Sequence, residues 1–122
     1  MIQIAYVNVF VSDLDRAIEF FGTKLGLALT HSDAEHGYAS FDTGTVRLGI
    51  AVADAGSRDL VGYHTGIGFA VADLVGEHTR LSELDVAFPM PPTRQPWGGF
   101  MALMSDPDGN VFYLDEVSAA HT

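Results

Sequence analysis

Apolar and polar residues alternate along two stretches of the chain in the way that is typical of half-buried β-strands. In residues 4–11, valines occupy one face while polar and aromatic side chains occupy the other. Residues 67–71 repeat the alternation, with Ile, Phe and Val on one face and Gly and Ala on the other. Apolar residues at helical spacing follow each stretch, in residues 14–25 and 74–84. The pattern therefore predicts two strand–helix units.

Three further strands are expected after each helix, separated by Gly- and Asp-rich turns. The six ranges are 27–32, 38–41, 46–52, 86–90, 100–105 and 110–117. The clearest turn is Asp106-Pro107-Asp108-Gly109, because proline presets φ and glycine accepts a positive φ. Residues 91–99, rich in Pro and Gly, are expected to form a loop, and residues 53–62 a linker.

A short sequence repeat relates the two halves of the chain. Val11-Ser12-Asp13-Leu14 recurs as Val71-Ala72-Asp73-Leu74, and each copy joins a predicted strand to a predicted helix. Ser12 and Asp73 are the expected N-caps of these helices. Two copies of a βαβββ module, at about residues 1–53 and 63–118, predict one α+β domain over residues 1–122. A ligand-binding cleft is expected where the modules meet.

Composition and charge narrow the functions that this domain can have. The chain has no cysteine, which excludes disulfides and thiolate metal sites and fits a cytoplasmic location. The sequence shows no signal peptide and no apolar stretch near the roughly 20 residues that span a bilayer, so no membrane partner is expected. Six Lys and Arg against sixteen Asp and Glu give a net charge of −10, which disfavours nucleic acid as a partner.

The repeat and two further motifs resemble the vicinal oxygen chelate superfamily. Its members include glyoxalase I, extradiol dioxygenases and bleomycin-resistance proteins. The motifs are Val-Ser-Asp-Leu-Asp-Arg-Ala-Ile-Glu-Phe-Phe at 11–21, Gln-Pro-Trp-Gly at 95–98 and Asp-Pro-Asp-Gly-Asn at 106–110. The resemblance covers essentially the whole chain. It implies a cupped, eight-stranded mixed sheet with helices on its convex face, usually completed in a homodimer.

The resemblance also implies where a metal would be bound in the metal-dependent members. The four equivalent positions in this chain are Tyr6, Leu48, Gly66 and Tyr113. Those enzymes place His, Glu or Gln there, whereas Gly and Leu offer no side-chain donor and neutral tyrosine is a poor ligand. We therefore expect no metal at these positions and no cofactor.

Strand alternation, if its register is as expected, gathers the candidate binding residues on the concave face. They include Tyr6, Asn8, Leu48 and Tyr113, while Arg47 is expected on the helix side of its strand. An apolar surface with phenols and an amide suits a small, partly aromatic ligand. The alternative interpretation is that these side chains pack against one another and fill the cup.

Two further residues are candidates for the site. His64 is expected on the same face as Gly66, where it would act as a general acid/base, a displaced metal ligand or a hydrogen-bonding group at a strand edge. Trp97, the single tryptophan, lies in a Pro- and Gly-bounded loop. Aromatic residues in this region of bleomycin-resistance-like members stack on planar ligands. The alternative is that Trp97 anchors its loop or packs in a dimer interface.

Three functions are compatible with the sequence. The first is a metal-independent dimeric binding protein that sequesters a small molecule such as an antibiotic or secondary metabolite. The second is a lyase, isomerase or dioxygenase-like enzyme of the same fold, with His64, Tyr6, Tyr113 or Asp115 as acid/base candidates or with a rearranged metal site. The third is a small structural or regulatory dimer with a filled cup. The sequence does not decide whether the protein is an enzyme.

Overall fold

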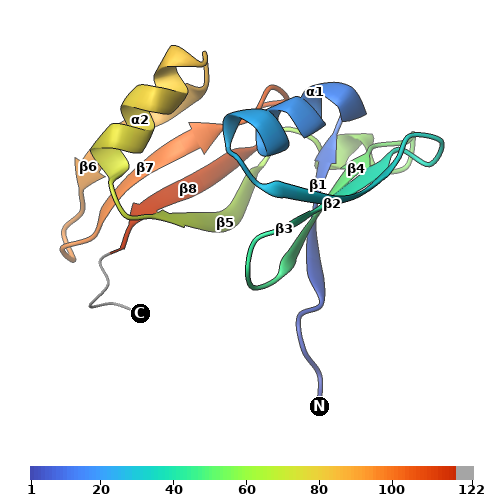
Figure 1. Ribbon diagram of the computed structural model, residues 1–122, viewed down its shortest axis with the longest axis horizontal. Coiled ribbons are helices and arrows are strands. Elements are labelled where there is room, and N and C mark those ends of the chain that lie inside the picture. The colour runs from blue at the N-terminus through green and yellow to red at the C-terminus, as the bar shows by residue number, and fades with distance from the viewer. Residues whose placement is uncertain (118–122) are drawn as a thin grey trace. The chain divides into compact units, whose positions relative to one another are not determined.

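The computed structural model describes residues 1–117 and divides the chain into two compact units (Figure 1). Unit 1 comprises Met1–Tyr63 together with Pro107–Gly109. Unit 2 comprises His64–Asp106 and the residues from Asn110 onward. The predicted end of the second module, at residue 118, lies outside the described residues.

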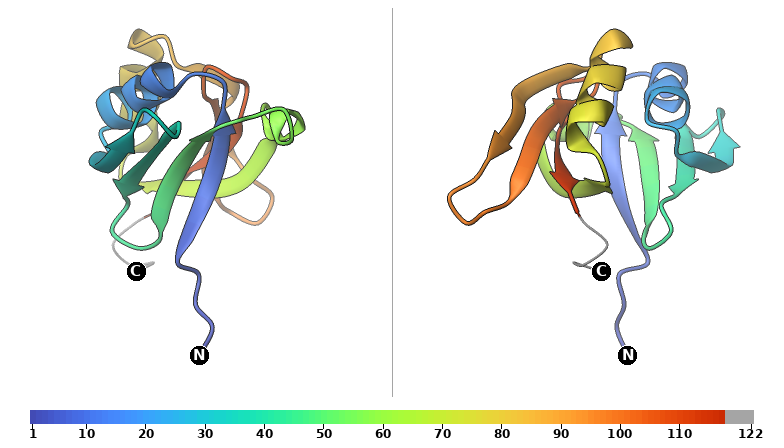
Figure 2. Two further views of the ribbon diagram at one scale, coloured as in Figure 1. Left: turned by 90° about the vertical axis from the view of Figure 1, so that its right-hand side faces the viewer. Right: turned by 60° about the vertical axis from the view of Figure 1, so that its left-hand side comes forward.

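Unit 1 contains one four-stranded sheet and a short helical segment. Its elements are β1 (Tyr6–Val11), α1 (Leu14–Ile18), η1 (Glu19–Lys24), β2 (Ala28–Asp33), β3 (Tyr38–Asp42), β4 (Arg47–Val52) and η2 (Arg58–Leu60). The strand order is β1-β4-β3-β2, with β1 parallel to β4 and the other pairs antiparallel. The α1 helix packs against β3 and β4, so one face of this sheet is covered (Figure 2).

The first helix begins at Leu14, as its apolar spacing predicted, but its N-cap is one residue later than predicted. Asp13 is the N-cap, and its carboxylate accepts a hydrogen bond of 2.9 Å from the backbone N–H of Arg16. The prediction of Ser12 as the cap was wrong, because the Ser12 hydroxyl bonds to Asp108 instead. Beyond Ile18 the helix continues as a π-helical segment, η1, rather than as the predicted α-helix.

Unit 2 repeats the plan of unit 1 with a longer helix. Its elements are β5 (His64–Val71), α2 (Leu74–Glu83), β6 (Ala87–Arg94), β7 (Phe100–Ser105) and β8 (Val111–Glu116). The strand order is β5-β8-β7-β6, with β5 parallel to β8. Asp73 caps α2 as predicted, since its carboxylate accepts a bond of 3.0 Å from the Gly76 N–H.

The core of unit 2 lies between α2 and one face of its sheet. The helix contacts β6, β7 and β8 and buries Leu74 and Leu81 completely or nearly so. Alternate residues of β7 and β8 meet it, namely Ala102, Met104, Phe112 and Leu114, all at most 3% exposed. Because successive strand residues point to opposite faces, the residues between them lie on the face that α2 leaves uncovered.

Strand β6 is longer than the sequence predicted. Residues 91–94, expected to belong to a loop, continue the strand through Pro91 and Pro92 to Arg94. Proline cannot donate to a strand ladder, but β6 is the outermost strand of its sheet and pairs on one side with β7. The loop between β6 and β7 is therefore shortened to residues 95–99.

The predicted α+β class with two βαβββ modules is confirmed. Within residues 1–117, eight strands form two four-stranded mixed sheets, each with helical structure between its first two strands. Among residues 1–117, the structure contains no helix that is long and apolar enough to cross a membrane.

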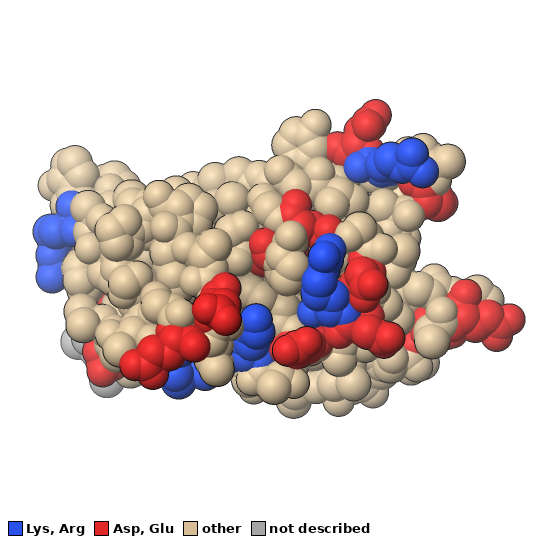
Figure 3. Space-filling view, turned by 90° about the horizontal axis from the view of Figure 1, so that it is seen from above, with Lys and Arg blue, Asp and Glu red and all other residues tan. Residues whose placement is uncertain are grey.

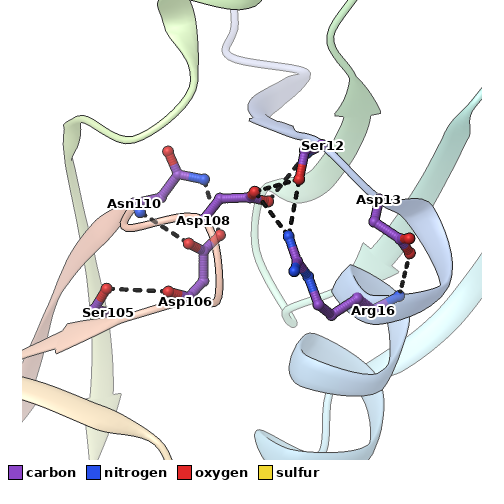
Figure 4. A network of polar contacts seen from close by, with 7 residues as sticks. All are labelled: Ser12, Asp13, Arg16, Ser105, Asp106, Asp108 and Asn110. Atoms are coloured by element: carbon purple, nitrogen blue, oxygen red, sulfur yellow. Dashed lines mark hydrogen bonds and ion pairs between the residues drawn. The ribbon is translucent and has the colours of Figure 1, made fainter.

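The turn between β7 and β8 is held by side chains at both of its ends (Figure 4). The Asp106 carboxylate accepts bonds of 2.8 Å from the backbone N–H and from the side-chain amide of Asn110. Gly109 has φ +82°, as the sequence predicted for this turn. Both Asp106 and Asn110 are buried, so these bonds satisfy polar groups that would otherwise be costly.

Asp108, which belongs to unit 1, accepts hydrogen bonds from residues at the start of α1 (Figure 4). Its carboxylate accepts from the Ser12 N–H at 3.1 Å, the Ser12 hydroxyl at 2.5 Å and the Arg16 guanidinium at 3.0 Å. The Asp108 side chain is 8% exposed and that of Arg16 49%, so the acceptor is shielded from water while its cationic partner is partly exposed. Hydrogen bonds to a shielded charge are stronger than those between neutral groups.

We expect Asp108→Ala to lower the free energy of unfolding by about 2 kcal/mol, because three donors lose a charged acceptor. Glu35→Ala is the matched control, since Glu35 is an exposed acid in the turn between β2 and β3. Its effect should stay within about 0.5 kcal/mol. Urea denaturation followed by circular dichroism measures both variants. Equal stability of the two variants would show that the Asp108 contacts contribute little.

Candidate functional site

The uncovered face of unit 2 places polar side chains of β8 beside small residues of β5. Gly68 pairs with Tyr113, and Ala70 pairs with Asp115. Tyr113 and Asp115 alternate with buried residues of β8, so their side chains point away from α2. This face therefore presents a phenol and a carboxylate beside residues of β5 that have little or no side chain.

His64 lies at one end of this surface and contacts Tyr113. Their ring centroids are 4.7 Å apart, with a tilt of 58° between the planes. The His64 Nδ1 accepts a hydrogen bond of 3.1 Å from the Gly66 N–H. A nitrogen that accepts carries no proton, so the neutral ring holds its proton on Nε2. His64 thus presents Nε2–H as a donor.

Gly66 makes this arrangement of the histidine possible. Its φ is +73°, a conformation that side-chain-bearing residues seldom adopt. The β5–β8 pairing shifts register between His64 and Gly68, so Gly66 lies within a local irregularity of β5. No atom would come within 4 Å of a Cβ at Gly66, which leaves open space beside His64.

Asp115 has an unusual environment for a carboxylate. Burial raises the pKa of Asp115 above its ordinary value. A Cβ at Gly68 would lie 3.4 Å from Asp115 Oδ2, so the glycine keeps the carboxylate accessible from the β5 side. Within residues 1–117, no side chain or backbone group donates a hydrogen bond to the Asp115 carboxylate, and no ion pair includes it.

Trp97 projects from the tight turn that joins β6 to β7. The Gln95 N–H bonds to the Gly99 carbonyl at 2.7 Å, and the Gly98 N–H bonds to the Gln95 carbonyl at 2.9 Å. Gly98 has φ +95°, which fits the tight turn. The turn is thereby fixed, and Trp97 is 75% exposed. Its indole lies against Gly99, where an added Cβ would come 2.7 Å from Nε1.

Arg94, at the end of β6, supports the same turn. Its guanidinium donates to the Gly98 carbonyl at 3.0 Å and lies 4.6 Å from the centre of the Phe100 ring. Both contacts are favourable for a cation, through a charge-assisted hydrogen bond and a cation–π interaction. Arg94 therefore stabilises the platform from which Trp97 projects.

Tyr6 and Asn8 lie on the uncovered face of unit 1. The Arg47 guanidinium is 5.9 Å from the centre of the Tyr6 ring, which is half exposed. A Cβ at Gly49 would collide with Asn8 Oδ1 and the Tyr38 hydroxyl, so these side chains close over the glycine. The structure thus places Tyr6 and Asn8 in unit 1, and His64, Tyr113 and Trp97 in unit 2.

Leu48 is on the opposite face from Tyr6 and Asn8, contrary to the prediction. Leu48 pairs with Val7 and Phe41 and is 1% exposed, so it belongs to the core. The expectation that Arg47 points to the helix side was wrong for the same reason. A strand has a side-chain period of two, so an error of one residue exchanges its two faces.

The sequence did not predict that the Asp115 carboxylate has no hydrogen-bond or ion-pair partner among residues 1–117. The sequence singled it out as an acid/base candidate, but not as a carboxylate without a partner. Whether a carboxylate has a partner depends on neighbouring strands, which the local pattern does not specify. The alternation along residues 110–117 was the available signal, because it predicted that Tyr113 and Asp115 share a face.

The residues at the family's metal-binding positions do not fit a divalent metal. Leu48 is buried in the core, Gly66 has no side chain, and Tyr6 and Tyr113 offer only phenols. Over residues 1–117 there is also no group of three His, Cys, Asp or Glu side chains that could hold a metal ion.

Comparison with known proteins agrees with the motifs and the fold. The model of the Glyoxalase/Bleomycin resistance protein/Dioxygenase superfamily matches residues 3–114. The chain belongs to this superfamily. A search of curated proteins found no match to this superfamily member.

Solved structures of the superfamily resemble this member over nearly its whole length. A member from Sphaerobacter thermophilus is 26% identical with a TM-score of 0.83, covering 96% of this chain and 98% of its own. TnmS3, an antibiotic binding protein from Streptomyces sp. CB03234, is 27% identical with a TM-score of 0.77. The match covers 97% of this chain and 98% of TnmS3. A family enzyme from Burkholderia phytofirmans shares the fold, with 19% identity and a TM-score of 0.81. The match covers 95% of this chain and 99% of that enzyme.

We expect Asp115→Asn to raise the free energy of unfolding near neutral pH. Because burial raises the folded-state pKa of Asp115, its ionised form opposes folding above that pKa. As the pH falls through the folded-state pKa, the carboxyl takes up a proton and the advantage of the variant should vanish. Urea denaturation at about pH 7 and about pH 4 measures this change. A variant that is less stable at neutral pH would mean that the carboxylate is held by favourable contacts.

Proposed function

We propose that this superfamily member is a metal-independent protein that binds a small, planar aromatic molecule, such as an antibiotic or secondary metabolite. The observation that carries the proposal is the exposed Trp97 on a hairpin turn fixed by its own hydrogen bonds. A rigid, exposed aromatic ring offers stacking area at little conformational cost. Metal independence is supported by the donor set, since phenols, Gly and Leu give no adequate ligands.

Similarity to TnmS3 supports the same proposal. That protein is described as antibiotic binding, and at 27% identity it aligns with 97% of this chain. His64 and Tyr113 would add further aromatic surface in unit 2. Tyr6 and Asn8 are candidate binding residues of unit 1. We propose further that the protein works as a homodimer in the cytoplasm, in keeping with the family resemblance and the absence of cysteine.

Catalysis by the same face is the second candidate function. It is favoured by the bond from the Gly66 N–H to His64 Nδ1, which leaves Nε2–H as the donor of a ring that contacts Tyr113. An oriented imidazole is the usual group for general acid/base chemistry. His64→Gln retains a polar side chain but cannot exchange a proton near neutrality. An enzyme would lose turnover in this variant, while a binding protein would show no turnover in either form.

The binding proposal is tested with planar aromatic probes and the fluorescence of Trp97, the single tryptophan. We expect quenching by a binding probe, and an affinity about tenfold lower in Trp97→Ala when measured by calorimetry. Trp97→Phe should recover most of the affinity, because it retains an aromatic face. Val75→Ala, on the exposed side of α2, is the control and should bind like the unchanged protein. Unaltered affinity in Trp97→Ala would reject stacking on Trp97.

A further inference from the structure

We propose that Asp115 binds a cationic nitrogen of the ligand, so that the site selects planar molecules with a protonated amine over neutral or anionic ones. This inference rests on the proposed binding function and adds the chemical class of the ligand. It starts from a carboxylate on the uncovered face of unit 2 whose charge no described residue compensates.

Four other acidic side chains of unit 2 have structural roles, while Glu83 and Asp85 are exposed. Asp73 caps α2, Asp106 holds Asn110, and Glu77 pairs with Arg80 at 2.8 Å. Glu116, the residue after Asp115, accepts a bond of 3.2 Å from the Leu74 N–H. Asp115 differs from these residues because its carboxylate has no comparable role within the described fold.

The neighbours of Asp115 on the sheet are uncharged. Ala70 lies opposite it on β5 and Met101 opposite it on β7, while Gly68 borders its Oδ2. Arg94, on β6, already interacts with Gly98 and Phe100. A half-buried carboxylate among apolar neighbours gains more from a bound cation than an exposed one does, because water screens the pair less.

Aromatic rings in unit 2 and the net charge of the whole protein favour the same kind of ligand. Tyr113 is two residues from Asp115 on β8, and the faces of Tyr and Trp rings attract cations. The protein carries a net charge of −10, which raises the local concentration of cations at its surface. Figure 3 shows Lys and Arg side chains next to Asp and Glu over much of the face in view, with one basic group at its left edge apart from them.

Three planar probes of different charge test the inference. They are 9-aminoacridine, which is a cation at neutral pH, acridone, which is neutral, and anthracene-9-carboxylate, which is an anion. We expect 9-aminoacridine to bind most tightly of the three probes. Asp115→Asn should weaken the binding of 9-aminoacridine about tenfold, which corresponds to about 1.4 kcal/mol of binding free energy. Binding of acridone should change less than about twofold in the same variant.

Two further variants separate the carboxylate from other effects. Glu83→Gln removes an acid from the exposed end of α2 and should leave the affinity for 9-aminoacridine unchanged, because the net charge alone is not decisive. Gly68→Ala retains Asp115 but places a methyl 3.4 Å from its Oδ2, and should weaken cation binding. Melting curves of the variants establish that each one is folded.

The outcomes distinguish this inference from the proposed function. Equal binding of the three probes, unaffected by Asp115→Asn, would overturn the role of Asp115 and leave the binding function standing. An equal loss of affinity in Glu83→Gln would assign the preference to overall charge and would also overturn it. If none of the probes binds, the proposed function fails and the inference fails with it.

Discussion

One-sided burial of each sheet is the constraint on which the rest of the structure depends. Each four-stranded sheet has helical structure against one face, and the alternation of strand residues sends every second side chain into that core. Phe112 and Leu114 are therefore fixed by packing, whereas Tyr113 and Asp115 between them are not needed for the core. The fold leaves these intermediate positions available for chemistry, and the candidate site is built from them.

Local signals were sufficient to predict most elements. Asp73 before a helical pattern and Gly109 in a turn act through contacts with near neighbours in the sequence, so both roles could be predicted. The register of β4 could not be obtained in the same way. Every residue from Leu48 to Val52 is small or apolar, so the sequence does not show which face is buried. Pairing with β1 and β3 decides it and places Leu48 in the core.

The candidate site was predictable in its residue types and only partly in its arrangement. His64 and Tyr113 were expected on a common face, and the structure brings their rings into contact. The orientation of His64 depends on the positive φ of Gly66, a conformation that glycine permits but does not require. The exposed position of Trp97 depends on hydrogen bonds across its turn and on Arg94, which contacts Gly98 in the turn and Phe100 at the start of β7.

The prolines of β6 have a consequence for the behaviour of the protein in solution. An outermost strand with free N–H groups is a template on which another chain can add a strand, which is a common start of aggregation. Pro89, Pro91 and Pro92 have no N–H group. Because consecutive strand residues point their N–H groups to opposite edges, the pair Pro91-Pro92 removes a donor from each edge, and the outer edge of β6 cannot complete a regular ladder with an incoming strand. The strand that carries the Trp97 hairpin is thus protected against self-association along its edge, even though the hairpin itself exposes a large aromatic side chain.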